Sequence, residues 1–336
     1  MIPSSRGRRA RVGAGALTYL SVANLVMVLV MAFAQPAFAY VRYRTTALLG
    51  GLGAPYAWGR SSLNIVGYTH GIPTMPADQI GAAMTAAVAA WSKQDPANTA
   101  CSFLDLSVAI QPVDALPPAA DHDDVNTIAL RDGVWTDICT KMKDGTTVCH
   151  QPGELALTTV WSRGCGEIVE ADVEVNADTS TPSAFMWADL DVTATNGGYH
   201  DLQNALTHEM GHFIGLDHTC ELAPGAAAGE VDDLGNAVPD CGDATAAEME
   251  ATMYPSSEAG DVSKRSLSQD DRNGLCAIYP VGTNPVTCGA SSASSGGCAV
   301  ASDPGAANGP RAVRWFTIVG GALGLAVLFA GRRRRS

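Results

Sequence analysis

The chain of 336 residues contains 21 Lys and Arg against 34 Asp and Glu, which gives a formal net charge of −13. Ten of the basic residues lie in the terminal segments, so residues 40–297 hold eleven Lys and Arg, thirty-three Asp and Glu, and a net charge of −22. Phosphate repulsion by such an acidic surface excludes nucleic acid as a partner. The nine cysteines indicate disulfides in an exported chain.

Residues 1–39 predict a secretory signal peptide. Four arginines between positions 6 and 11 precede an apolar run over residues 17–33, and the small residues Ala37 and Ala39 follow. Cleavage after Ala39 would make the protein secreted or exposed on the cell surface. A retained N-terminal anchor is the alternative. Residues 40–57 then form a short segment ahead of the first domain-like sequence.

Two stretches have the periodicity of helices. Residues 77–93 (ADQIGAAMTAAVAAWSK) place their large apolar side chains on one face, which predicts a long helix. Residues 199–207 place Leu202 and Leu206 at helical spacing, with Asp201 near the start as an N-terminal charge. A second helix is therefore expected there.

Strands and isolated histidines lie between these two helices. Residues 154–160 and 168–176 predict strands, and the second (IVEADVEVN) alternates acidic with apolar residues. His122 and His150 each stand alone in polar surroundings. We expect both histidines to be solvated loop residues and not metal ligands.

Residues 208–218 (HEMGHFIGLDH) extend the second predicted helix and carry a metal-binding pattern. His208 and His212 lie one helical turn apart, so both imidazoles leave the same face and are able to bind one Zn²⁺. Gly215 would end the helix in a conformation that a Cβ atom resists. The chain would then return His218 as the third ligand.

Glu209 follows the first histidine and has a different predicted role. From its place on the helix its carboxylate would reach a metal-bound water without being a ligand itself. Three protein ligands leave the fourth zinc position open, which is typical of catalytic zinc and not of structural zinc.

Two downstream stretches complete a resemblance to a known family. Residues 251–255 (ATMYP) would place the Met253 thioether in an apolar gap beneath the three imidazoles, while Tyr254 is not assigned as a ligand. Residues 267–279 (LSQDDRNGLCAIY) predict a closing amphipathic helix. Together with the zinc pattern, these stretches resemble the matrixin branch of the metzincin zinc metalloproteases.

The resemblance covers residues 58–282 and implies an α+β catalytic domain. We expect a twisted, mostly parallel sheet with an antiparallel edge strand, two long helices and a small C-terminal lobe around the zinc cleft. Residues 168–176 are the expected edge strand, which would hold an extended substrate through main-chain hydrogen bonds. Neither a Pro-Arg-Cys-Gly pro-segment nor a His-x-Asp cluster for a second zinc is expected ahead of the zinc helix.

The implied activity is that of a secreted zinc endopeptidase acting on proteins or peptides. Glu209 would take a proton from the zinc-bound water as it attacks a peptide carbonyl, and would return that proton to the leaving amine. Two alternatives stay open on sequence grounds. The domain is a catalytically silent zinc-containing surface-binding module, or it hydrolyses a non-peptide amide.

An acidic insert separates the zinc pattern from the methionine segment. A solvated acidic loop is its expected structure, and a Ca²⁺ site built from oxygen ligands is the second candidate. The carboxylates available for that site are Glu230, Asp232, Asp233, Asp240 and Asp243.

The cysteines other than Cys298 number eight and allow 105 pairings. A cysteine-based zinc site is the competing use, but no Cys-x-x-Cys occurs in the sequence. Local spacing favours the first two of the following pairs and leaves the other two by elimination: Cys139–Cys149, Cys220–Cys241, Cys101–Cys165 and Cys276–Cys288.

The C-terminal region resembles an export tag. Residues 283–310 form a linker rich in Gly, Ser and Ala that contains Gly297-Cys298, and residues 311–336 combine an apolar helix with an arginine cluster. This order is similar to the C-terminal sorting tags of myxobacterial secreted proteins, in which the helix is removed at the Gly-Cys motif. A plain tail anchor is the alternative. Membrane contact is expected only through this segment.

Overall fold

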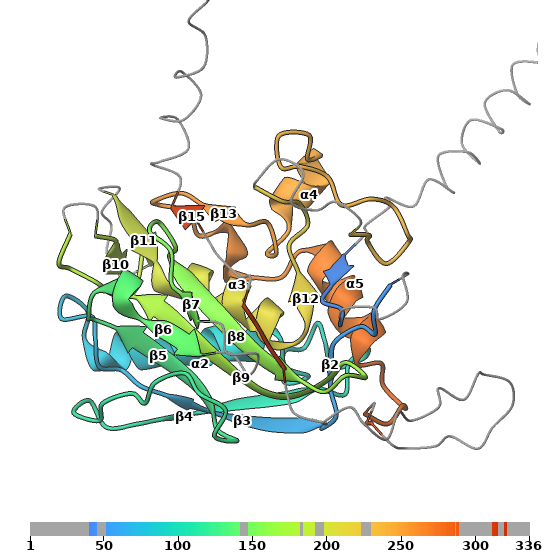
Figure 1. Cartoon of the computed structure of the whole chain (residues 1–336), viewed down its shortest axis with the longest axis horizontal. Coiled ribbons are helices and arrows are strands. Elements are labelled where there is room, and N and C mark those ends of the chain that lie inside the picture. The colour runs from blue at the N-terminus through green and yellow to red at the C-terminus, as the bar shows by residue number, and fades with distance from the viewer. Residues whose placement is uncertain are drawn as a thin grey trace, which may run out of the picture. The chain divides into compact units, whose positions relative to one another are not determined.

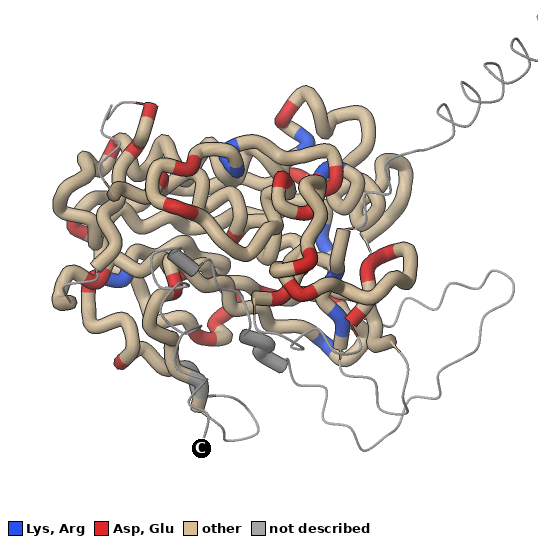
Figure 2. Tube along the Cα trace, turned by 90° about the horizontal axis from the view of Figure 1, so that it is seen from above, with Lys and Arg blue, Asp and Glu red and all other residues tan. Residues whose placement is uncertain are grey.

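The protein is described by a computed structural model. The described residues are 40–45, 52–141, 147–181, 184–191, 198–222, 230–285, 287–288, 311–314 and 319–320. The expected signal peptide, the Gly297-Cys298 motif and the arginine cluster at 332–335 lie outside the described residues. Figure 2 shows Asp and Glu spread along the described chain with few Lys and Arg among them, in keeping with the acidic composition.

A seven-stranded sheet forms the centre of the domain (Figure 1). Its main path runs β14-β8-β9-β5-β3-β4, and β2 pairs in parallel with β9. Strands β4, β3, β5 and β9 are mutually parallel, whereas β8 runs antiparallel to β9. The strands are β2 (Ala57–Trp58), β3 (Ser62–Gly67), β4 (Asp105–Ile110), β5 (Asn126–Arg131), β8 (Ala156–Ser162), β9 (Glu167–Asn176) and β14 (Arg311–Arg314). The predicted α+β class with a mostly parallel sheet is therefore confirmed.

Two helices, α2 (Ala77–Ala90) and α3 (Leu202–Phe213), pack against each other beside the sheet. The helix predicted at 77–93 is confirmed, with Trp91 as its C-terminal cap. The Trp91 indole nitrogen donates a hydrogen bond of 2.7 Å to the Thr207 carbonyl oxygen and so joins the end of α2 to α3. Burial of their apolar faces against each other and against the sheet is the main stabilising term for both helices.

The prediction that residues 168–176 form the edge strand is wrong. Strand β9 lies between β8 and β5, and nearly all of its side chains are buried, including Glu170, Asp172 and Glu174. Their carboxylates have partners inside the protein, so an alternating pattern here does not mark a solvent-facing surface. The antiparallel strand next to β9 is β8.

The remaining elements surround the sheet and the helices, and α5 confirms the closing helix predicted at 267–279. Residues 40–57, expected to precede the domain, contribute β1, which pairs with β12 beside α3. The strands are β1 (Val41–Arg42), β6 (Cys139–Lys141), β7 (Thr147–Cys149), β10 (Met186–Ala188), β11 (Tyr199–Asp201), β12 (Leu216–Asp217), β13 (Ser256–Ser257) and β15 (Val319–Gly320). The helical segments are η1 (Trp135–Asp137), α4 (Ala246–Glu250), η2 (Ser263–Arg265) and α5 (Gln269–Ile278).

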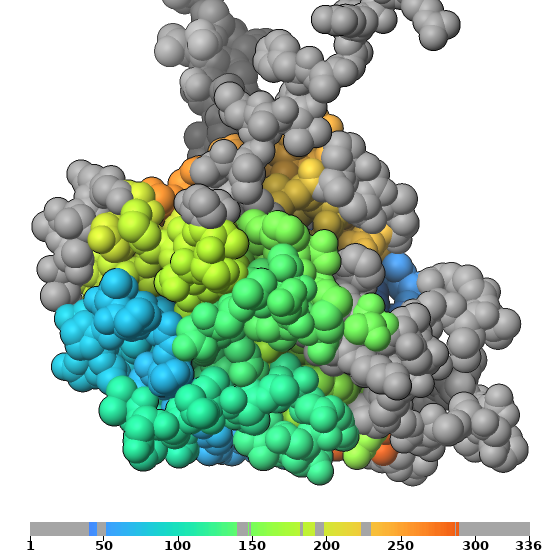
Figure 3. All heavy atoms as spheres, turned by 60° about the vertical axis from the view of Figure 1, so that its left-hand side comes forward, coloured from blue at the N-terminus to red at the C-terminus, as the bar shows by residue number. Residues whose placement is uncertain are grey.

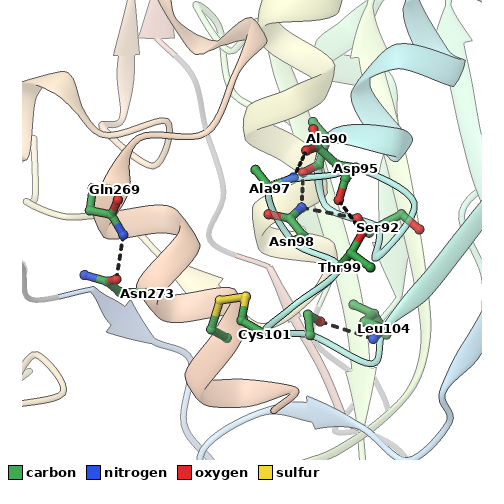
Figure 4. Close-up of a disulfide and its surroundings, with 12 residues drawn as sticks. Ala90, Ser92, Asp95, Ala97, Asn98, Thr99, Cys101, Leu104, Gln269 and Asn273 are labelled. Carbon is green, nitrogen blue, oxygen red and sulfur yellow. Dashed lines mark hydrogen bonds between the residues drawn. A yellow bond between two sulfur atoms is a disulfide. The ribbon is translucent and has the colours of Figure 1, made fainter. Parts of the chain in front are cut away.

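Four disulfides link the described cysteines. The two pairs predicted from local spacing, Cys139–Cys149 and Cys220–Cys241, are present. The two pairs assigned by elimination are wrong, because the structure joins Cys101 to Cys276 and Cys165 to Cys288. Figure 4 shows the first of these bonds between α5 and the loop that follows α2. Only the tertiary arrangement brings these distant cysteines together.

The C-terminal segment is described in two short pieces, and both are strands. β14 pairs antiparallel with β8, and β15 pairs in parallel with β13. Neither described piece is helical, and the other residues of 311–336, where an apolar helix is expected, lie outside the described residues. Among the residues that the structure describes, no helix has the length and apolar character needed to cross a membrane.

Candidate metal centre

Helix α3 is fixed at both ends by features that the sequence predicts in part. The Asp201 side chain caps the helix by accepting a hydrogen bond from the Asn204 amide at 2.8 Å, and the Arg265 guanidinium holds the same carboxylate. Gly215 ends the last turn with a φ of +99°, and a Cβ atom there would lie 2.8 Å from the Tyr56 carbonyl oxygen. The predicted role of Gly215 as the helix terminator therefore agrees with the geometry.

The Nε2 atoms of the three predicted ligands lie close to one another. The Nε2 atom of His208 lies 3.1 Å from that of His212 and 3.2 Å from that of His218, and the last two Nε2 atoms are 3.2 Å apart. Tetrahedral zinc with nitrogen ligands at about 2.0–2.1 Å separates those nitrogens by about 3.3 Å. The triangle of nitrogens therefore fits one zinc ion with a fourth position left open.

The other ring nitrogens of two of these histidines are held by backbone oxygens. His208 Nδ1 lies 2.6 Å from the Thr252 carbonyl oxygen, and His212 Nδ1 lies 3.0 Å from that of Leu216 and 2.9 Å from the Tyr43 hydroxyl. A proton on Nδ1 that is donated to a carbonyl leaves the Nε2 lone pair free for a metal. The N-terminal segment thus takes part in the site through Tyr43, which sequence reasoning missed.

Burial keeps these imidazoles neutral. It lowers the pKa of His208 and His218 well below the ordinary value and lowers the pKa of His212 to about 3. A neutral imidazole is the form that binds a metal. The three histidines are therefore ready to act as ligands at physiological pH.

Met253 packs against α3 at Gly211, the residue before His212. Its side chain is buried, and its sulfur lies so close to Gly211 of α3 that a Cβ atom at that position would meet it at 2.1 Å. The Asp271 carboxylate accepts hydrogen bonds from the Thr252 and Met253 amides at 2.8 and 3.2 Å. Asp271 thereby ties this turn to α5, a role that its place in the predicted closing helix did not indicate.

Glu209 is buried next to the three histidines. The Thr158 hydroxyl of β8 donates a 2.6 Å hydrogen bond to Glu209 Oε2, while Oε1 is buried and has no hydrogen-bond partner among the described residues. Burial raises the pKa of Glu209 to about 8. One oxygen is therefore fixed by β8, and the other is unengaged and able to accept a proton.

Lys264 is a further buried charge that the sequence did not single out. Its ammonium donates to the Tyr254 carbonyl oxygen, and its backbone amide donates to Asn204 Oδ1 at 2.7 Å. Burial lowers the pKa of Lys264 to about 8. The residue connects the segment after Met253 with the first turn of α3.

The prediction that His150 is solvated is wrong. Its ring is buried against Trp135, with ring centroids 4.0 Å apart, and its Nε2 lies 3.1 Å from Glu174 Oε2. His122 is partly buried, with 30% of its side chain exposed, and its Nε2 lies 3.8 Å from Glu170 Oε2. The polar residues next to both histidines in the sequence suggested exposed loops. In the fold, however, each histidine lies beside a buried carboxylate of β9.

The acidic insert does not bring its five carboxylates into a calcium site. The Asp232 carboxylate accepts from the Leu234 amide at 2.9 Å and from the Asn236 amide at 2.8 Å, so it closes a local turn. Within the described part of the insert, no three of the carboxylates lie close enough to share an ion.

Comparison with known families points to the same site. Residues 146–259 match the model of peptidase family M43, described as pregnancy-associated plasma protein-A. A search of curated proteins found no match. The matched region runs from β7 through β13 and includes the three histidines, Glu209 and Met253. The match supports a metzincin-type zinc metallopeptidase, and it does not support the matrixin branch in particular.

Proposed function

We propose that the protein is a zinc-dependent endopeptidase in which His208, His212 and His218 hold the metal and Glu209 is the general base. The observation that carries this proposal is the convergence of three neutral imidazole nitrogens beside a buried carboxylate with one unengaged oxygen. Zinc, when bound, would lower the pKa of a coordinated water and polarise a substrate carbonyl.

Within this proposal Glu209 moves the proton. Its Oε2 is held by the Thr158 hydroxyl, so Oε1 is the atom that accepts a proton from the attacking water. The protonated carboxyl then donates to the nitrogen of the leaving amine. Enclosure of the carboxylate among buried side chains strengthens its electrostatic interactions with the reacting groups.

An extended peptide is the substrate class that the surrounding backbone favours. Strand β8, which carries Thr158, pairs on its outer side with β14 of the same chain, and β13 pairs with β15. Both backbone edges therefore accept an extended chain, antiparallel at β8 and parallel at β13 (Figure 1). Peptide binding by strand addition uses such main-chain hydrogen bonds.

We further propose that the protein works outside the cytoplasm, secreted or held at the cell surface. Four disulfides are maintained in oxidising compartments and are rare in reducing ones. Recovery of the protein in culture medium or on intact cells, with its cysteines oxidised, would test this location.

Glu209→Gln is the decisive variant for the activity. It keeps the size and polarity of the side chain but removes the base, so we expect zinc content to be unchanged and cleavage of casein to fall by at least about a thousandfold. Glu250→Gln on the exposed surface of α4 is the matched control and should cleave like the wild type.

Two results would contradict the proposal. Wild-type-like cleavage by Glu209→Gln would exclude Glu209 as the base. If the wild type and Glu209→Gln both bind zinc and neither cleaves casein or peptides, the silent binding module is favoured. Turnover of a simple amide by such a protein would favour the non-peptide hydrolase.

A further inference from the structure

Three carboxylates are buried side by side on β9, away from the zinc helix. Thr158 of β8 faces Glu209 and pairs with Val173, which places Val173 on the helix side of the sheet. The neighbouring positions Glu170, Asp172 and Glu174 therefore point to the opposite side. In the view of Figure 3 the teal and green segments, which follow α2 and precede β9, form a continuous surface.

The partners of these carboxylates differ. Arg131 Nε lies 2.7 Å from Glu174 and His150 Nε2 lies 3.1 Å from it, so Glu174 has a guanidinium and an imidazole as neighbours. Asp172 accepts hydrogen bonds from the Thr127 amide and hydroxyl at 2.9 and 2.7 Å. The third carboxylate, Glu170, is fully buried as well, and a buried carboxylate is costly unless it is paired or coordinates a metal.

The loop before β5 folds over Glu170. The amides of Asp123 and Asp124 donate to its two oxygens at 3.0 and 2.7 Å, which fixes the carboxylate in place. His122 Nε2 lies 3.8 Å from Glu170 Oε2 and packs edge-on against Trp161. This nitrogen is buried and has no hydrogen-bond partner among the described residues.

We propose that His122, Asp124 and Glu170 form a second zinc site, contrary to the expectation from the sequence that His122 is not a ligand and that no such site lies ahead of the zinc helix. Each offers one ligand atom, and these atoms lie within 4.8 Å of one another. The unpaired imidazole nitrogen is aimed at the carboxylate across a gap too long for a hydrogen bond, and a bridging metal would engage both. Its role would be to fasten the loop before β5 to the centre of the sheet.

The donor set argues for zinc over calcium. One imidazole nitrogen and two carboxylate oxygens suit zinc, whereas Ca²⁺ takes six to eight oxygen ligands and has no use for an imidazole. Zinc also brings a positive charge to Glu170, which has neither a guanidinium nor a hydroxyl partner among the described residues. The site uses none of the residues of the proposed catalytic centre and does not depend on it.

Zinc content and thermal stability of the full chain test this site. We expect the purified protein, saturated with zinc and desalted, to retain about two zinc ions per chain. His122→Ala should retain about one and lose most of the rise in melting temperature that zinc gives the wild type. His70→Ala is the matched control: His70 is a partly exposed histidine that lies 3.5 Å from Asp132, and this variant should retain both ions.

Further variants separate this site from folding defects and from the catalytic centre. Asp124→Asn changes an exposed residue by one atom, so it should fold normally and still weaken the second zinc. His212→Ala should lose the other zinc and keep this one, whatever its effect on peptide cleavage. A single zinc per chain that is lost in His212→Ala, or a zinc content unaffected by both His122→Ala and Asp124→Asn, would overturn the proposal.

Discussion

At the scale of single residues, the proposed general base depends on one hydroxyl. Thr158 donates a 2.6 Å hydrogen bond to Glu209 Oε2, and both groups are buried. Hydrogen bonds to charged groups contribute about 1.5–3 kcal/mol, because a lost partner leaves a buried charge unsatisfied. Thr158 is therefore a positioning residue for Glu209.

Thr158→Val should slow peptide cleavage by about ten- to a hundredfold, which corresponds to the loss of that hydrogen bond. Zinc content should not change, since the Thr158 hydroxyl bonds to Glu209 and not to any of the three histidines among the described residues. Steady-state kinetics should place the loss in kcat. Thr158→Ser restores the hydroxyl and should recover most of the rate, whereas an equally slow Thr158→Ser would argue against the hydrogen bond as the cause.

Asp270 makes stability depend on pH. Its carboxyl is buried, Oδ1 has no hydrogen-bond partner among the described residues, and burial, helped by Asp271 and Asp233, raises its pKa to about 7. Folding therefore favours its protonated form, and the unfolded chain releases the proton near pH 4. The resulting stabilisation is complete below about pH 4 and is lost as the pH rises toward 7.

Asp270→Asn should remove this dependence. We expect the variant and the wild type to have similar melting temperatures near pH 4, and the variant to be the more stable of the two at pH 8. Thermal unfolding followed by circular dichroism at both values measures the difference. A constant offset between the two proteins across this range would contradict the raised pKa of Asp270.

At the scale of elements, α5 controls the turn beneath the histidines. Asp271 accepts hydrogen bonds from the Thr252 and Met253 amides, and it also accepts one from the Ser268 amide at the start of α5. The neighbouring Asp270 makes no comparable set of bonds among the described residues. Of these two adjacent carboxylates of α5, Asp271 stabilises the folded protein through its hydrogen bonds, whereas a charged Asp270 destabilises it.

Asp271→Ala should lower the free energy of unfolding by about 2–4 kcal/mol, because it leaves three amides without their acceptor. It should also weaken zinc binding, since the Thr252 carbonyl oxygen orients His208. Competition with a zinc chelator measures the second effect. Asp270→Ala is the matched control and should bind zinc as the wild type does; equal losses in both variants would point to general damage to α5.

Local sequence patterns predicted the helix and the histidines of the site. The predictions that failed were those that depended on contacts between residues far apart in the sequence. Spacing alone placed the histidines on α3 and after Gly215, because a helix fixes the relation between positions four apart. The assignment of β9 as an edge failed because buried acids with internal partners alternate along a strand just as exposed ones do. Thr158 and Tyr43 approach the site from distant parts of the chain and have no sequence signal.

At the scale of the whole molecule, the disulfides differ greatly in the length of chain that they enclose. Cys101–Cys276 links residues 175 positions apart and ties α5 to the loop after α2 (Figure 4). Cys139–Cys149 links residues only 10 positions apart within the β6–β7 hairpin. A longer closed loop removes more conformational entropy from the unfolded chain.

Removing the first of these bonds should therefore cost more than removing the second. In the chain-entropy account, loops of these lengths contribute about 5 and about 3 kcal/mol, and the other disulfides shorten the longer loop and narrow the gap. We expect the Cys101→Ser/Cys276→Ser double variant to melt several degrees below Cys139→Ser/Cys149→Ser. Loss of zinc should accompany that melting, because α5 carries the Asp271 contacts that hold the turn beside His208. Equal melting temperatures would mean that tertiary packing, and not the Cys101–Cys276 bond, holds α5 in place.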